Sequence, residues 1–177
     1  MKDLNILFAG FGGQGVLFSG KVIAYAGMME GKEISWLPSY GPEMRGGTAN
    51  CSVCISDNKI GSPLVTNPDI LVAMNLPSLD KFEKDIVPGG MIILDSTLIK
   101  RKVERDDVNV IYLPASKLSE DAGVKGAANM VIVGRLWKET KFCSEENLDK
   151  GLVKSIPAKK MDLLDKNRKM ISTGVNS

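Results

Sequence analysis

The run Gly10-Phe11-Gly12-Gly13-Gln14-Gly15 is the feature that most restricts how this chain can fold. It fits the pattern G-x-G-x-x-G and lies between an apolar run, Leu4 to Ala9, and an apolar-periodic segment, Val16 to Met29. In this order the segments predict a strand, a tight loop and a helix that ends with Gly31 as its C-cap. A strand, glycine loop and helix form the opening unit of a Rossmann-like α/β fold.

Two interpretations of the glycine loop stay open. Glycines let backbone N–H groups and a helix N-terminus approach a phosphate or pyrophosphate, but they also permit a tight turn with close helix packing and no ligand. An NAD site would require an acidic residue at the end of the second strand. That strand ends Trp36-Leu37-Pro38-Ser39. The missing acid argues against a conventional NAD or FAD dehydrogenase and leaves another phosphate-bearing ligand, or none.

The rest of the chain predicts a three-layer α/β fold in one domain over residues 1–177, with a mostly parallel sheet and helices on both faces. The second strand, Glu33 to Pro38, is expected to be parallel to the first after a right-handed crossover. The stretch Ser39 to Gly47 predicts a loop, and Gly174 to Ser177 are expected to fray. Further strands are expected at Thr48–Ser56, Asp69–Met74, Met91–Asp95 and Val108–Leu113, and helices at Ser78–Lys84, Asn129–Glu139, Glu145–Val153 and Lys160–Met170.

Charge and hydropathy exclude several classes of partner. The chain has 23 Lys and Arg against 21 Asp and Glu, a formal charge of +2, so no general attraction to nucleic acid or to an anionic membrane is expected. The first apolar run, Leu4 to Ala9, is too short to span a bilayer and continues into the glycine loop where a signal peptide would have its cleavage site. We therefore expect a cytoplasmic protein, with any anion site confined to a local patch.

The chain lacks the residues that most redox and acid–base centres need. It contains no His and three Cys, too few for a four-thiolate iron–sulfur cluster. Cys51 and Cys54 form a C-x-x-C pattern, but in a predicted strand they point to opposite faces and cannot chelate together. Cys143 is interpreted as structural. We expect no catalytic residue and no metal ligand in this chain, so any redox centre that it serves lies elsewhere.

The loop that follows the second strand is a second candidate site. It reads Ser39 to Thr48 and lies, like the glycine loop, at the carboxyl edge of the predicted sheet, so the two loops are expected to share one crevice. Arg45 can present a guanidinium fork to a phosphate or carboxylate, and Tyr40 can stack or donate a hydrogen bond. Two alternatives stay open: Arg45 pairs with Glu43 and orders the loop, or the loop meets a partner subunit.

A third candidate combines Lys125, flanked by glycines, with Asn129 at a predicted helix N-terminus. Asn is a common N-cap residue, so Asn129 can serve the helix alone. A lysine beside the positive end of a helix also suits a phosphate. Both interpretations remain possible from the sequence.

Five motifs resemble a known family, the gamma subunits of 2-oxoacid:ferredoxin oxidoreductases. They are GFGGQG at Gly10–Gly15, WLPS at Trp36–Ser39, YGPEMRGGT at Tyr40–Thr48, Pro68-Asp69 and Asn129-Met130. The resemblance covers nearly the whole chain, and YGPEMRGGT is its most specific part. The chain is most similar to the 2-oxoglutarate branch, with the pyruvate, branched-chain and indolepyruvate enzymes as relatives of the same chemistry.

The resemblance implies a fold like domain III of pyruvate:ferredoxin oxidoreductase and a role inside a complex. Such an enzyme uses thiamine diphosphate, Mg and iron–sulfur clusters to convert a 2-oxoacid and coenzyme A to acyl-CoA, CO2 and reduced ferredoxin. It also implies that the cofactors belong to alpha and beta subunits, or to a delta subunit for the clusters, and that this chain alone holds none and is inactive. The rival hypothesis is a stand-alone nucleotide-binding or regulatory protein.

The resemblance further implies which residues meet the cofactor region and coenzyme A. The loop residues would face that region, Arg45 and Lys125 would bind coenzyme A phosphates, and Tyr40 and Asn129 would add polar contacts. The loop residues in question are Gly12, Gly13, Gln14 and Gly15.

Overall fold

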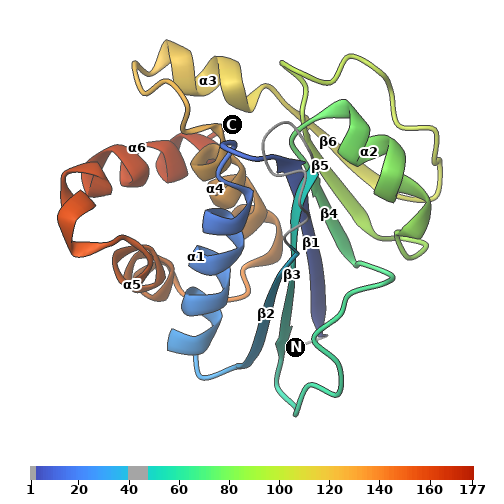
Figure 1. Cartoon of the computed structure of the whole chain (residues 1–177), viewed down its shortest axis with the longest axis horizontal. Helices are drawn as coiled ribbons and strands as arrows, with labels where there is room; N and C mark the ends of the chain where they lie inside the picture. Colours follow the sequence, from blue (N-terminus) through green and yellow to red (C-terminus); the bar gives the residue numbers. More distant parts are fainter. Residues whose placement is uncertain (1–2, 40–47) are drawn as a thin grey trace.

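The computed structural model describes residues 3–39 and 48–177, which form a six-stranded sheet with helices on both faces (Figure 1). The strand order is β2-β3-β1-β4-β5-β6. The strands are β1 (Leu4–Phe11), β2 (Glu33–Ser39), β3 (Thr48–Ser56), β4 (Ile70–Ala73), β5 (Met91–Asp95) and β6 (Asn109–Leu113). Along the series β1-β4-β5-β6, neighbouring strands pair in parallel, whereas β3 is antiparallel to both β1 and β2. The prediction of an α/β fold with a mostly parallel sheet is confirmed.

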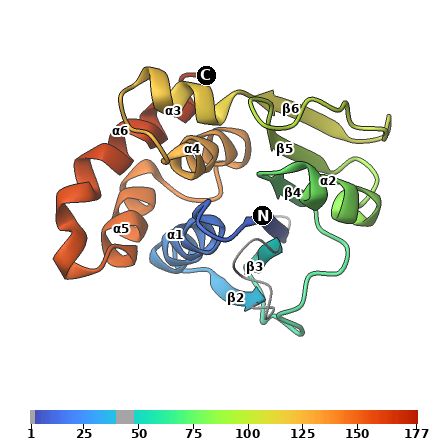
Figure 2. The same cartoon turned by 45° about the horizontal axis from the view of Figure 1, so that its top comes forward.

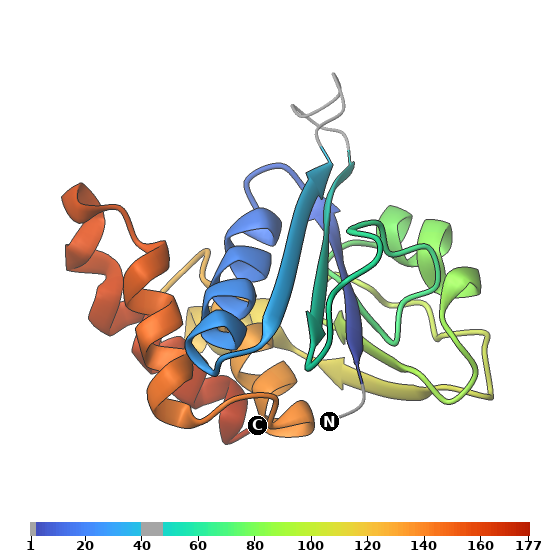
Figure 3. The same cartoon turned by 90° about the horizontal axis from the view of Figure 1, so that it is seen from below.

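The helices cover the two faces unequally. On one face lie α1 (Val16–Met29) and α4 (Ala128–Thr140), and α5 (Glu145–Ser155) and α6 (Leu164–Val175) pack on these two helices from outside (Figures 1 and 3). The other face carries α2 (Leu76–Phe82) and the short 3-10 helix η1 (Glu83–Asp85). A short α3 (Ala115–Asp121) precedes α4, and a 3-10 helix η2 (Ala158–Leu163) joins α5 to α6. The face of α1 is therefore backed by two helical layers.

The middle of strand β1, Ile6 to Ala9, is apolar because both of its faces are buried. Ile6 and Phe8 belong to the core cluster shared with α1 and α4, whereas Leu7 and Ala9 belong to the cluster shared with α2. Side chains alternate between the two faces of a strand, so a central strand needs apolar residues at every position. Each large side chain contributes about 1.5–3 kcal/mol by its burial. This packing fixes the carboxyl end of β1, from which the glycine loop starts.

The strand beside β1 on the side of β2 is β3, and not β2 as the simple crossover would give. β2 runs in the same direction as β1, but β3 lies between them and pairs with both. β3 is buried on both faces, which suits an inner position, whereas β2 is half-exposed and contains Pro38. Proline has no backbone N–H and is restricted to edge strands or strand ends. β2 therefore lies at the edge of the sheet, and the simple parallel crossover expected from β1 to β2 is wrong.

Several helix predictions are corrected in detail. α2 begins earlier than expected because the side chain of Asn75 accepts a hydrogen bond from Ser78 N at 2.8 Å and caps the helix. α3 was not predicted, and a buried Asp95 holds its first turn by accepting from Ser116 N and Oγ. Of the C-terminal residues expected to fray, Gly174 and Val175 belong to α6 and Gly174 is buried, whereas Asn176 and Ser177 follow the helix and are exposed.

The predicted helix Lys160–Met170 is two elements, η2 and α6. Lys160 has φ −123° and ψ 19°, which interrupts regular helical geometry in η2. The helix α6 then continues to Val175. The other strand predictions match the structure to within one residue at each end, except that β1 continues two residues beyond the predicted Ala9, to Phe11. Gly31 follows α1 with φ +78°, as a C-cap glycine does.

A buried carboxylate, Glu83, predicts how stability responds to acid. Its side chain accepts from the guanidinium of Arg101 and from the backbone N–H of Glu104. Burial favours the neutral form of the carboxyl, but these donors outweigh it and hold the pKa of Glu83 below its ordinary value of 4.5. A folded-state pKa below the unfolded value stabilises the fold above 4.5, and this contribution is lost as the pH falls through the folded-state pKa.

We therefore expect the wild type to lose its stability advantage over Glu83→Gln as the pH is lowered. Urea unfolding midpoints of both proteins, measured between about pH 7 and pH 3, give this difference directly. Because both proteins contain all the other carboxylates, the difference between their unfolding midpoints reports on Glu83 alone. A difference that stays constant across this range would contradict the assignment.

Candidate functional site

The glycine loop joins β1 to α1 as the sequence predicts. Gly13 and Gly15 have φ values of +92° and +75°, a region that side chains with a Cβ rarely occupy. Gly15 is the N-cap residue of α1, and no side chain caps this helix end and no acidic residue lies in its first turn. The positive end of α1 therefore presents backbone N–H groups that suit an anion.

Gln14 fixes the shape of the loop from within. Its Oε1 accepts from Phe11 N at 2.6 Å, and its Nε2 donates to the carbonyl of Met74 at 2.9 Å. Asn75, the cap of α2, adds a longer contact of 3.4 Å from Nδ2 to Oε1. The side chain thus links the loop to the carboxyl end of β4. Because its amide is engaged inside the chain, Gln14 positions the loop backbone.

Asn129 connects the glycine loop to α4. It is the second residue of α4, and Ala127 occupies the N-cap position without a side-chain hydrogen bond. The possible role of Asn129 as N-cap is therefore excluded. Instead Asn129, which is 7% exposed, donates from Nδ2 to the carbonyl of Gly15 at 3.3 Å. A Cβ on Gly15 would overlap this amide, so the approach requires glycine.

The loop that carries Lys125 is held by a buried serine of α3. Ser119 Oγ donates to the carbonyl of Val124 and accepts from Ala127 N at 3.1 Å. Gly123 and Gly126, with φ values of +75° and +84°, allow the chain to turn on either side of Lys125. The lysine is thereby held on a short, hydrogen-bonded loop at the start of α4.

These elements enclose a cavity of about 800 Å³. Its lining residues come from the glycine loop and the start of α1, the loop before α4, the end of α5, η2 and the start of α6. The described residues that line it include four lysines, Lys21, Lys125, Lys160 and Lys166, and no Asp or Glu. The volume is in the range of roughly 300–1,000 Å³ that is usual for small-molecule sites. A concave, positively charged pocket beside a helix N-terminus suits a phosphorylated ligand.

The predicted site residues fall into three groups in the structure. The cavity brings together Gly13, Gly15, Lys125 and Asn129. Gly12 and Gln14 lie in the same glycine loop but do not line the cavity. Tyr40 and Arg45 lie outside the described residues.

The flanks of the second loop lie at the same edge of the sheet as the glycine loop. Thr48 pairs with Phe11, the last residue of β1, and Ser39 pairs with Asn50 of β3. The carboxyl ends of β1 and β2 point the same way (Figure 3). The expectation that the two loops emerge at a common edge is confirmed for the residues that flank the second one.

Three lysines of the cavity were not predicted. Lys21 follows Gly15 by six residues and lies on the second turn of α1. Lys160 lies in η2 and Lys166 in the first turn of α6, far along the chain. Their segment contains other lysines, and no local pattern separates the two that line the cavity.

The cysteines take the separate positions that strand parity predicts. Cys51 Sγ contacts the carbonyl of Val16 on the α1 side, whereas Cys54 Sγ contacts that of Ser62 beyond the end of β3. Burial raises the pKa of Cys51 to about 12, and burial likewise raises the pKa of Cys143 to about 12. Within residues 3–39 and 48–177, no three His, Cys, Asp or Glu side chains gather as a metal site requires. The same part of the chain has no helix long and apolar enough to cross a membrane.

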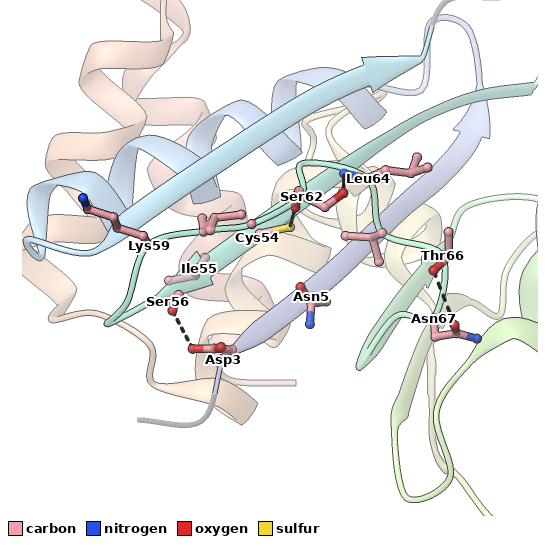
Figure 4. A pocket seen from close by; sticks show the side chains of 13 residues that line it. Asp3, Asn5, Cys54, Ile55, Ser56, Lys59, Ser62, Leu64, Thr66 and Asn67 are labelled. Carbon is pink, nitrogen blue, oxygen red and sulfur yellow. Dashed lines mark hydrogen bonds between the residues drawn. The ribbon is translucent and has the colours of Figure 1, made fainter.

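A second cavity, of about 310 Å³, lies under the segment that follows β3 (Figure 4). Its polar groups are largely engaged with one another: Ser56 Oγ donates to Asp3 at 2.6 Å, and Thr66 Oγ1 contacts Asn67 at 3.4 Å. Lys59 extends away from Asp3 in Figure 4. This cavity is smaller and carries a carboxylate, so it suits an anion less well than the lysine-lined cavity does.

Comparison with known proteins places the chain in a family. The family model described as pyruvate ferredoxin/flavodoxin oxidoreductase matches residues 5–177. The chain is 39% identical over 172 residues to the ketoisovalerate oxidoreductase subunit VorA of Methanothermobacter thermautotrophicus, covering 97% of this chain and 36% of that relative. It is 36% identical over 156 residues to the 2-oxoglutarate synthase subunit KorC of Methanocaldococcus jannaschii, covering 86% of this chain and 83% of that relative.

A solved structure is similar over almost all of the chain. It is the 2-oxoglutarate:ferredoxin oxidoreductase from Magnetococcus marinus with 2-oxoglutarate, coenzyme A and succinyl-CoA bound. The TM-score is 0.87 at 26% identity, and the match covers 99% of this chain and 31% of that one. This chain therefore spans about a third of the length of this structure and of VorA.

Proposed function

Because this chain belongs to the pyruvate ferredoxin/flavodoxin oxidoreductase family, as one of its gamma-type subunits, we propose that it works inside a cytoplasmic 2-oxoacid:ferredoxin oxidoreductase. The complex would convert a 2-oxoacid and coenzyme A to acyl-CoA, CO2 and reduced ferredoxin. Its partners would be alpha and beta subunits, with a delta subunit as a further candidate. Thiamine diphosphate, Mg and iron–sulfur clusters would reside in those partners.

The contribution proposed for this chain is a wall of the coenzyme A site. The single observation that carries the proposal is the lysine-lined cavity at the glycine loop. Gly13 and Gly15 bring backbone N–H groups to one side of it, and Lys125 adds a cation on the loop before α4. Asn129 holds these two segments together. Arg45 and Tyr40, from the loop at the same edge, are proposed to complete the phosphate contacts.

The substrate proposed is 2-oxoglutarate, on the basis of the motif resemblance and of KorC, the relative named as a 2-oxoglutarate synthase subunit. VorA is named for ketoisovalerate and is 39% identical, against 36% for KorC, so branched-chain 2-oxoacids are the second candidates. The assay is coenzyme A-dependent viologen reduction by the complex purified anaerobically from its native host, with each 2-oxoacid in turn. Recovery of this chain alone and inactive would favour a stand-alone binding protein.

Lys125→Ala and Arg45→Ala are expected to raise the apparent KM for coenzyme A by about tenfold each, with little change in kcat. The loss of a charge-assisted hydrogen bond to a phosphate has about this effect. Steady-state kinetics of the assembled enzyme with varied coenzyme A measure it. Lys117→Ala is the matched control, because Lys117 is exposed on α3 and pairs with Asp121. If both variants keep the wild-type KM, neither residue binds coenzyme A.

A further inference from the structure

The cavity receives positive charge from two different parts of the fold. One part is the glycine loop with the start of α1 and the adjacent Lys125. The other part is η2 with the first turn of α6, which supplies Lys160 and Lys166. These segments belong to the outer helical layer, beyond α1 and α4 (Figure 2). A ligand that meets both parts therefore needs anionic groups at two places.

The chain between Lys160 and Lys166 is not one regular helix. In a regular α-helix, residues six apart are rotated by about 240° and face different directions. Here Lys160 lies in the 3-10 helix η2 with φ −123°, and α6 begins at Leu164. Both lysines line the same cavity.

These two lysines have no anionic partner in the described part of the chain. Other lysines do: Lys117 pairs with Asp121, and Lys150 with Glu146. The nearby acid Asp165 is 3.5 Å from Arg168 instead. Within residues 3–39 and 48–177, Lys160 and Lys166 therefore add positive charge to the cavity that no carboxylate neutralises.

The cavity wall also includes apolar side chains. Phe18, Val124, Ile156 and Leu163 line the cavity together with the lysines. A ligand that fits this lining has phosphate groups for both charged parts and a flat, weakly polar unit for the apolar side chains. The 3′-phosphoadenosine diphosphate part of coenzyme A has these groups, because its ribose carries the 5′-diphosphate, the 3′-phosphomonoester and the adenine. A phosphomonoester carries a charge of about −1.5 to −2 at neutral pH.

We infer that Lys160 and Lys166 bind the ribose 3′-phosphate of coenzyme A, while the glycine loop and Lys125 bind the diphosphate. This inference rests on the proposed function, because it assumes that coenzyme A is the ligand of the cavity. It assigns to η2 and the start of α6 the discrimination between coenzyme A and dephospho-coenzyme A, which lacks this phosphate.

The test compares coenzyme A with dephospho-coenzyme A as substrates of the assembled enzyme. The wild type is expected to favour coenzyme A by about tenfold or more in kcat/KM, the effect of a charge-assisted contact. The double variant Lys160→Ala/Lys166→Ala is expected to lose this preference through a raised KM for coenzyme A, with the KM for dephospho-coenzyme A unchanged. Lys160→Arg/Lys166→Arg is expected to retain it.

Lys159→Ala is the matched control, because Lys159 is exposed beside Lys160 but does not line the cavity. It is expected to behave as the wild type. A wild type without preference, a preference that survives the double alanine variant, or an equal loss for both substrates overturns the inference. If one of these outcomes is found but Lys125→Ala still raises the KM for both substrates, the proposed coenzyme A site is supported and only the assignment of Lys160 and Lys166 is wrong. If no variant alters either KM, the proposed site fails as well.

Discussion

Gly174→Ala is expected to lower the free energy of unfolding by about 3 kcal/mol and the Tm by roughly 10 °C. Gly174 lies where α6 crosses α4, and a Cβ there would come closer than 3.0 Å to the carbonyl oxygen of Val131. The crossing is reciprocal, since a Cβ on Gly134 of α4 would meet the carbonyl of Ile171 in the same way. Alanine stabilises a helix by about 1 kcal/mol relative to glycine. A net loss of stability would therefore show that the clash between α6 and α4 outweighs this gain.

Thermal and urea unfolding of the isolated variants measure this effect. Ser172→Ala is the matched control, because Ser172 is exposed in the same helix and its change is expected to alter stability by less than about 0.5 kcal/mol. Gly134→Ala is expected to act like Gly174→Ala, since the obstacle is again backbone. If Gly174→Ala were neutral or stabilising, α4 and α6 would be able to separate at little cost.

Gly15→Ala is expected to raise the KM for coenzyme A by about 100-fold or more, or to abolish coenzyme A-dependent turnover. Two effects combine at this position. The φ of +75° is unfavourable for alanine, and the added Cβ would overlap the Asn129 side chain. Either the loop or the start of α4 must move, and both line the proposed phosphate site. The measurement is coenzyme A-dependent viologen reduction by the assembled enzyme, with its assembly checked by gel filtration.

Gly13→Ala separates the two effects. Gly13 also has a positive φ, but a Cβ there meets nothing within 4 Å, so this variant carries the backbone strain alone and is expected to be milder. The double variant Gly15→Ala/Asn129→Ala removes the overlap and is expected to recover part of the affinity. If Gly15→Ala assembles and keeps a wild-type KM, the glycine loop does not bind the phosphates of coenzyme A.

The sequence predicts the parts of this fold that local patterns determine. The glycine loop between an apolar strand and a periodic helix is such a pattern, and the opposite orientation of Cys51 and Cys54 follows from strand parity alone. The order of the strands is set by tertiary pairing. The prediction that β2 lies beside β1 did not take Pro38 into account. Pro38 favours an edge position, which leaves the place beside β1 to the fully buried β3.

The candidate site is predicted in part for the same reason. Lys125 and Asn129 follow from their own sequence context, because glycines flank the lysine and the asparagine begins a helix. Lys160 and Lys166 reach the cavity through the fold of the outer helices and through the irregular turn of η2. The link from Asn129 to Gly15 joins residues 114 positions apart, and no local pattern contains it.

The insertion of β3 between β1 and β2 also limits how the ligand preference of this chain can evolve. Neighbouring strands are about 4.8 Å apart, so the end of β2 lies roughly 9.5 Å across the sheet from that of β1. A carboxylate at Ser39 would thus stand one strand too far away to bind the ribose of a dinucleotide whose diphosphate rests on the glycine loop. A point mutation at the end of β2 therefore cannot supply that contact while β3 lies between the two strands.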